Sequence, residues 1–288
     1  MKKIILGIIG GLIIVVIAGG VWLYTGKFNS SKAKAFEKLS LPVAVAGSKT
    51  VSGKEFMSRL HLAEILYKGD KTYDATATEN QILDELIDST KLQQIAAAHK
   101  VTVSSKDIND EYQGIVGQFA GGDESKFKDI LSQTYQLSID EFKNKVIMPD
   151  ALKTNLTIWY DGQKDLNKAQ FAQAQTLLDK LAAGQPFEDM VKAYTQDPAT
   201  KDLGGDVGSV KLSQLSPEFQ GPISSAKAGD QLTIISRFGI HIVKVVDINK
   251  TGDEATYHLQ QVYIKEDGFQ AWYSQQADAI KTHKLLKF

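Results

Sequence analysis

The chain begins with an apolar run that contains no charged residue from Ile4 to Tyr24 and follows a pair of lysines. About 20 apolar residues at 1.5 Å rise each cross a hydrocarbon core of ~30 Å. Residues 1–27 are therefore predicted to form a membrane helix that inserts through residues 4–24. The preceding lysines favour a cytoplasmic N-terminus and extracytoplasmic domains after the helix. A cleaved signal peptide, followed by secretion, is the alternative because Ala18–Gly20 offers small residues for cleavage. The run exceeds the usual ~7–15 residues of a signal-peptide core, which favours an uncleaved anchor.

Residues 28–160 hold a polar segment followed by a mainly helical pattern. Residues 28–42 are rich in Ser and Lys and are predicted to be a polar linker, and apolar alternation after Val43 predicts a short strand. Residues 43–160 then repeat apolar positions at helical spacing, so this region is predicted to be a mainly helical domain. Capping boxes, in which a side-chain oxygen accepts from a backbone N–H three residues on, mark four helix starts. They are Ser52…Glu55, Thr78…Gln81, Ser104…Asp107 and Ser138…Glu141.

The pattern changes to mixed helix and strand in residues 161–288. Residues 163–183 and a segment after Pro186 have helical apolar spacing. Residues 232–236 and 240–245 are short apolar runs joined by a brief connection, which predicts a β-hairpin. Residues 257–265 form a further predicted strand, and the chain closes with a helix from Phe269 and a short terminal segment. The fold class is therefore α+β, with an antiparallel sheet and helices in the second soluble domain.

Composition narrows the function classes. The 33 basic and 34 acidic residues leave a net charge of -1, so no overall field favours nucleic acid. The chain has no cysteine, which excludes disulfides, thiolate metal sites and cysteine nucleophiles. It also lacks the short motifs of serine hydrolases, zinc proteases and P-loop proteins.

The most informative stretch runs from Asp197 to Val245. Together with the three residues before it, the stretch reads YTQDP, then GGDVG, then PEF, and ends in the hairpin with GIHIVKV. Taken singly these elements are common, and a lone His in an apolar strand is more often a core residue than a catalytic one. In this order and spacing they resemble the parvulin-type peptidyl-prolyl isomerases across about fifty residues. The resemblance implies an enzyme that isomerises X–Pro bonds without a metal or another cofactor.

The resemblance also implies the site residues. The proline pocket would use Val207, Leu215 and Phe219. The polar, catalytic side would use three places: a position that parvulins fill with an acidic residue or Cys, the hairpin, and the first strand of the domain. These positions correspond to Asp197, Ser236, His241 and Gln261.

Two features depart from the parvulin pattern. Parvulins carry a strand with a His before their first helix, whereas residues 156–160 here end a helix and no such strand is evident. The strand at 257–265 resembles the missing one, which implies a circularly permuted domain; the alternative is the start of a second, lost repeat. In this alignment Gln261 stands at the His position, while His258 points to the opposite sheet face. Because Gln does not titrate near neutral pH, the substitution bears on catalytic efficiency more than on fold.

The helical region resembles the N-terminal chaperone domain of the SurA/PrsA group of extracytoplasmic foldases. This resemblance implies shallow contacts with unfolded or extended secreted polypeptides that contain X–Pro bonds; a helical domain that only packs on its neighbour is the alternative. Three functions follow as hypotheses. The first is a membrane-anchored isomerase and foldase for secreted or envelope proteins. The second is a weak or inactive holdase that only binds extended chains, and the third is a structural envelope protein.

Overall fold

The computed structural model describes residues 23–39, 41–250, 254–265 and 267–288. The chain divides into two compact units. The first contains residues up to 99, 112–149 and 275–288, and the second contains residues 100–111 and 150–274. The predicted membrane segment, residues 4–24, lies outside the described residues except for its last two positions. In the described ranges, no helix is both long enough and apolar enough to cross a membrane.

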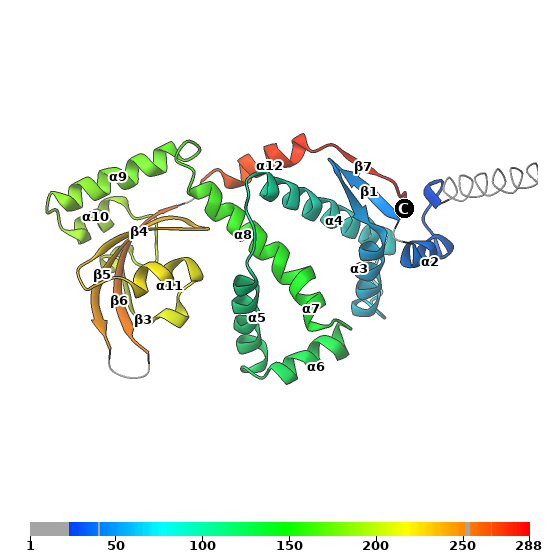
Figure 1. Ribbon diagram of the computed structural model, residues 1–288, viewed down its shortest axis with the longest axis horizontal. Helices are drawn as coiled ribbons and strands as arrows, with labels where there is room; N and C mark the ends of the chain where they lie inside the picture. The colour runs from blue at the N-terminus through cyan, green and yellow to red at the C-terminus, as the bar shows by residue number, and fades with distance from the viewer. Residues whose placement is uncertain (1–22, 40, 251–253, 266) are drawn as a thin grey trace, which may run out of the picture. The chain divides into compact units, whose positions relative to one another are not determined.

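The first unit contains a three-stranded antiparallel sheet in the order β2-β1-β7 (Figure 1). The strands are β1 (Pro42–Ala46), β2 (Lys49–Ser52) and β7 (Thr282–Lys284). Helices α3 (Gly53–Leu66) and α4 (Ala75–Ala98) supply much of its core, including the completely buried Phe56 and Leu83. The strand predicted after Val43 is confirmed. The C-terminal residues, predicted to belong to the second domain, pair here with β1 instead.

The segment predicted to be a polar linker folds as part of the first unit. Helix α2 (Ser30–Lys38) starts at Asn29, whose side chain accepts from the backbone N–H of Lys32. Phe36 on this helix is completely buried, and Phe28 packs on the same core against Phe56 with ring centroids 5.8 Å apart. The linker prediction is therefore wrong for residues 28–38, because the buried ring of Phe36 and the partly buried ring of Phe28 hold this segment on the core despite its polar composition.

Three of the four predicted capping boxes lie at helix starts. Ser52 caps α3, and Ser104 and Asp107 exchange hydrogen bonds at the start of α5 (Ser105–Ala120). Ser138 forms a complete box with Glu141. The fourth prediction is wrong: α4 is capped by Asp74, and Thr78 lies inside the helix, where its hydroxyl donates to the Asp74 carbonyl.

The remaining helices between residues 120 and 161 follow in close succession. They are α6 (Glu124–Thr134), α7 (Ile139–Phe142), a five-residue π-helical segment (Lys143–Ile147) and α8 (Met148–Asp161). Among the described residues 161–167, which link α8 to α9, there is no strand. The sequence showed no strand before the first helix of the second domain, and the structure has none in these residues.

The second unit is organised around a four-stranded antiparallel sheet in the order β3-β6-β5-β4 (Figure 1). The strands are β3 (Asp206–Lys211), β4 (Gln231–Ser236), β5 (Gly239–Asn249) and β6 (Thr256–Lys265). The predicted hairpin is β4–β5, and the strand predicted near the C-terminus is β6. Although β6 is the last of these strands in sequence, it occupies an inner position between β3 and β5.

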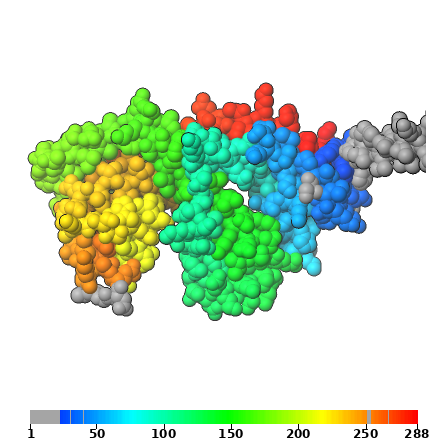
Figure 2. Space-filling view, viewed as in Figure 1, coloured from blue at the N-terminus to red at the C-terminus, as the bar shows by residue number. Residues whose placement is uncertain are grey.

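Helices cover both faces of this sheet. Helices α9 (Lys168–Ala182) and α10 (Phe187–Tyr194) pack against one face, and α11 (Pro217–Ser224) packs against the other. Two 3₁₀ turns flank β3, at Lys201–Leu203 and Leu212–Gln214, and α12 (Phe269–Ala279) follows β6. In the space-filling view the yellow-green helices α9 and α10 lie directly on the yellow and orange part of the same unit (Figure 2).

Candidate functional site

Side chains along β5 alternate between two apolar cores, one on each face of the sheet, and His241 is the polar residue among them. Ile240 and Ile242 pack on the face of α9 and α10, whereas Val243 packs on the α11 face. Because successive side chains in a strand point to opposite faces, His241 lies on the α11 face with Val243. Its side chain is buried, with 7% of the residue exposed.

Three strands and one loop bring the predicted polar residues together. Ser236 ends β4, and its Oγ lies 2.9 Å from Nε2 of His241. The other ring nitrogen of His241, Nδ1, lies 3.0 Å from Oε1 of Gln261 on β6. Gln261 in turn donates from Nε2 to Oδ2 of Asp197, at 2.9 Å. The four polar residues predicted from the sequence therefore form one hydrogen-bonded chain.

The loop after α10 holds Asp197 at the end of this chain. The Asp197 Oδ1 atom accepts from the backbone N–H of Ala199 at 3.0 Å, and Oδ2 accepts from the hydroxyl of Thr200 at 2.6 Å. The hydroxyl of Thr195 accepts the backbone N–H of Tyr263 on β6 at 3.0 Å. These bonds fix the carboxylate beside the sheet. Thr200 is buried, and the sequence analysis did not predict it as a site residue. Its position three residues after Asp197 could have indicated a local side-chain hydrogen bond.

The donors and acceptors in this chain run in one direction. A carboxylate only accepts, so Gln261 turns its amide N–H toward Asp197 and its carbonyl oxygen toward His241. The hydrogen on His241 then resides on Nδ1, and Nε2 accepts from the hydroxyl of Ser236. The Ser236 oxygen also accepts the backbone N–H of Phe238 at 3.0 Å. In a neutral imidazole, the network therefore fixes a single tautomer, with the hydrogen on Nδ1.

Electrostatics agree with a neutral imidazole. Burial lowers the pKa of His241 below its ordinary value, although the hydrogen bond with Gln261 and the charge of Asp197 act in the opposite direction. Desolvation is the largest of these effects because it penalises the charged form of a buried His.

Two aromatic rings flank the imidazole. The ring of Phe219 on α11 meets His241 edge to face, with centroids 5.0 Å apart. The ring of Tyr263 stacks on the imidazole at 4.9 Å and 27°, and its hydroxyl donates to the carbonyl of Phe238 at 2.7 Å. Tyr263 was not predicted as a site residue, although it lies two positions after Gln261 and therefore on the same face of β6.

The other two predicted pocket residues are placed differently. Leu215 is half-buried and packs with Phe219 against the apolar core on the α11 face. Val207 lies where the pairing of β3 with β6 shifts register, and it is 37% exposed. Leu215 and Phe219 thus share one apolar surface beside His241, and Val207 lies at the bulge of β3.

His258 takes no part in the hydrogen-bonded chain around His241. It lies three residues before Gln261 on β6, and its Nε2 lies 2.8 Å from Oδ1 of Asp206 on β3. The pKa of Asp206 is lowered, first by the backbone N–H of Gly208 and then by His258. This pair is a separate contact near the end of the sheet.

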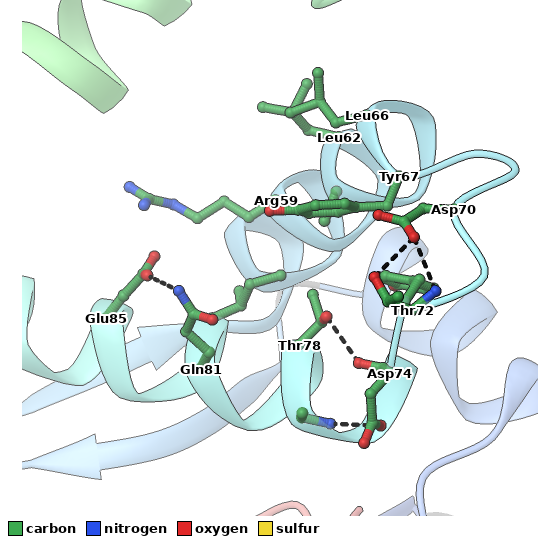
Figure 3. A pocket seen from close by; sticks show the side chains of 14 residues that line it. Arg59, Leu62, Leu66, Tyr67, Asp70, Thr72, Asp74, Thr78, Gln81 and Glu85 are labelled. Atoms are coloured by element: carbon green, nitrogen blue, oxygen red, sulfur yellow. Dashed lines mark hydrogen bonds between the residues drawn. The ribbon is translucent and has the colours of Figure 1, made fainter.

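The first unit contains a hollow of about 420 Å³ between α3 and α4. Figure 3 shows Leu62, Leu66 and Tyr67 on the α3 side of this hollow and Asp74 and Thr78 at the start of α4. Leu66 and Tyr67 are about half exposed, at 50% and 49%, and the ring of Tyr67 stacks on Tyr73 with centroids 5.6 Å apart. Acidic residues lie along its rim at Asp70, Asp74 and Glu85. The hollow therefore presents exposed apolar and aromatic side chains next to carboxylates.

Comparisons with known proteins cover both units. The family model described as the SurA-like N-terminal domain matches residues 1–148, and the PPIC-type PPIASE domain model matches residues 137–249. "Foldase protein PrsA" of Caldanaerobacter subterraneus is 25% identical over 244 residues, which span 77% of this chain and 74% of the relative. "Chaperone SurA" of Alkalilimnicola ehrlichii is 31% identical over 126 residues, 41% of this chain and 29% of the relative. A crystal structure of PrsA from Bacillus anthracis aligns at 18% identity over 69% of this chain and 86% of that chain, with a TM-score of 0.23.

Proposed function

We propose that this chain isomerises X–Pro bonds in unfolded polypeptides. The chain belongs to the family of proteins with a SurA-like N-terminal domain, and it carries a PPIC-type peptidyl-prolyl isomerase domain. The observation that supports the proposal is the hydrogen-bonded chain of Ser236, His241, Gln261 and Asp197, in which His241 is buried and contacts the ring of Phe219. Relatives named as foldases and chaperones support the class of client.

Catalysis of this kind acts on the partial double bond of the X–Pro amide. The barrier is ~18–20 kcal/mol, and uncatalysed exchange takes tens to hundreds of seconds. Phe219 and Leu215 would hold the proline ring, with Val207 at the edge of the same site. The fixed dipoles of Ser236, His241 and Gln261 would then favour the twisted amide over both planar forms. This reaction forms no covalent intermediate and uses no cofactor.

The role assigned to Gln261 is to position His241. Its amide joins Asp197 to the imidazole through two hydrogen bonds, at 2.9 and 3.0 Å, so a second imidazole is not needed to fix the tautomer. We further propose that the isomerase domain is circularly permuted. The inner position of β6 supports this proposal, because the last strand of the unit supplies Gln261 to a site whose other residues all precede it.

The proposed location is extracytoplasmic, with residues 4–24 as the membrane anchor. The apolar run and the preceding lysines support this topology. The proposed clients are secreted or envelope proteins in extended form.

The hollow between α3 and α4 favours a second candidate function, that of a holdase. Exposed Leu66 and Tyr67 offer apolar contact to an extended chain without any chemistry. A holdase would suppress aggregation of an unfolded protein whether or not it accelerated proline isomerisation. The two functions are therefore separable by measuring both activities on the same preparations.

The test is exchange NMR on a short X–Pro peptide with the full chain in mild detergent. Phe219→Ala and His241→Ala should each lower kcat/KM at least tenfold. Phe171→Ala serves as the matched control, because Phe171 is a partly buried Phe packed on the opposite face of the sheet. A wild-type chain that binds unfolded protein but leaves the peptide's exchange rate unchanged would refute the isomerase and leave the holdase.

A further inference from the structure

The second unit contains a hollow of about 600 Å³ beside the candidate isomerase site. Its apolar lining includes Ile158 of α8, Leu215 before α11, and Phe238 at the tip of the β4–β5 hairpin. Leu215 is also a wall of the proposed proline pocket, so the hollow and the pocket share this side chain. The volume lies within the ~300–1,000 Å³ typical of ligand pockets.

Carboxylates dominate the charged lining of this hollow. Asp107, Asp110 and Glu111 come from the start of α5, Glu218 comes from α11, and Arg237 is the basic side chain in the lining. Four carboxylates therefore face one guanidinium. The hollow has a net negative lining, although the chain as a whole carries a charge of only -1.

Some of this charge is already engaged. Asp110 pairs with Lys106, and Asp107 accepts the backbone N–H of Ser104 at 3.0 Å. Arg237 lies with its guanidinium carbon 4.9 Å from the ring centroid of Phe238.

Glu111 and Glu218 are the carboxylates on which the charge of the hollow depends most. Burial raises the pKa of Glu111, and the charge of Asp150 raises it further, while Arg237 opposes both effects. A further cation near Glu111 would therefore stabilise its ionised form. Glu218 is half-buried and comes from α11, where it precedes Phe219 of the proposed proline pocket.

We propose that this hollow binds the client residues that flank the proline and selects segments with Lys or Arg at these positions. The inference rests on the proposed isomerase function, because Leu215 places the flanking residues there only when the proline occupies the adjacent pocket. An extended chain advances ~3.3–3.6 Å per residue, so the basic residue should lie within two or three positions of the proline. The aliphatic stem of Lys or Arg suits the apolar lining, and its charged head suits the carboxylates.

The experiment uses the full chain in mild detergent and one X–Pro peptide in three versions. Lys, Gln or Glu occupies the position two residues before the proline, and a second set places the same residues two positions after it. Exchange NMR gives kcat/KM, and chemical-shift titration gives Kd. At low salt, the Lys version in at least one set should be preferred over the Glu version roughly three- to tenfold in both quantities. About 0.5 M salt should remove most of the preference.

The variant that tests the lining is Glu111→Gln combined with Glu218→Gln, which should abolish the preference for the Lys peptide. The matched control is Asp179→Asn combined with Glu188→Gln, which removes two carboxylates from α9 and α10 on the other face of the sheet. This control should keep the full preference. It separates a local effect of the hollow from a change in overall charge.

Equal Kd values for the Lys and Glu peptides in both sets would overturn the proposal. A preference that survives in the Glu111→Gln, Glu218→Gln variant would overturn it as well. If neither peptide isomerises faster, the isomerase function fails, but the Kd ratio still decides whether the hollow selects basic segments. Catalysis that is equal on all versions would support the isomerase and refute the charge selection.

Discussion

The buried imidazole of His241 predicts that acid destabilises the second unit well before carboxylates are protonated. In the folded state burial lowers the pKa of His241, whereas an unfolded His titrates near 6.5. Below that pH the unfolded chain binds a proton that the folded chain resists, so the free energy of unfolding falls as the pH falls. If His241 stays neutral when folded, one such proton costs about 1.4 kcal/mol between pH 7.5 and pH 5.5. This value is the maximum for a single group.

The assay is urea unfolding at pH 7.5, 6.5 and 5.5, followed by tryptophan fluorescence. Trp159 and Trp272 both lie in the second unit, with ring centroids 5.6 Å apart, so their emission reports its unfolding. The matched variant is His241→Gln, which removes the titrating ring. Burial raises the pKa of Glu111, which makes an opposite contribution at acid pH, and the difference between the two proteins removes that contribution. Equal pH dependence in the wild type and the variant would refute a neutral buried His241.

Two further predictions concern backbone and capping. Gly205→Ala should destabilise the second unit by more than ~2 kcal/mol, because the new Cβ would lie 2.5 Å from the Gln261 carbonyl oxygen at a φ of +81°. Gly208→Ala has the same φ with nothing within 4 Å, so thermal unfolding should show a loss of only ~1–2 kcal/mol; equal losses would contradict the steric reasoning. Ser138→Ala should cost the first unit about 1 kcal/mol in urea unfolding through loss of a complete capping box. Ser132→Ala removes an exposed hydroxyl inside α6 and should cost less, and the reverse order would contradict the capping assignment.

The parts of the fold that the sequence predicts are those decided by neighbouring residues. The β4–β5 hairpin and β6 follow from short apolar runs bounded by turn residues, and the α9 and α10 helices follow from their spacing. The resemblance to parvulins gave Gln261 as the first-strand position, and the alternation of strand side chains put His258 on the opposite face. Three of the four polar residues lie on strands and Asp197 lies in a loop, and their role in catalysis stays a prediction.

The parts that were missed depend on contacts distant in sequence. Strand β7 has only three residues and exists through its pairing with β1, more than 230 positions earlier along the printed chain. Phe28 and Phe36 lie in a polar stretch, so composition hid two core residues. At the start of α4, Asp74 and Thr78 are both residue types that cap helices, and Asp74 is the cap that the structure shows. Local patterns allow several such outcomes, and only the tertiary packing selects one.

A Gln at position 261 is compatible with the proposed chemistry for a physical reason. Rotation about an X–Pro bond transfers no proton, so its catalyst needs oriented dipoles more than titrating groups. An amide has both a donor and an acceptor, and in this chain they connect Asp197 to His241 in one fixed direction. Asp197 thereby sets the tautomer of His241, and the hydroxyl of Ser236 completes the chain at the other nitrogen. The site requires a residue at position 261 that links donor to acceptor, and Gln meets that requirement without adding a second group that protonates near neutral pH.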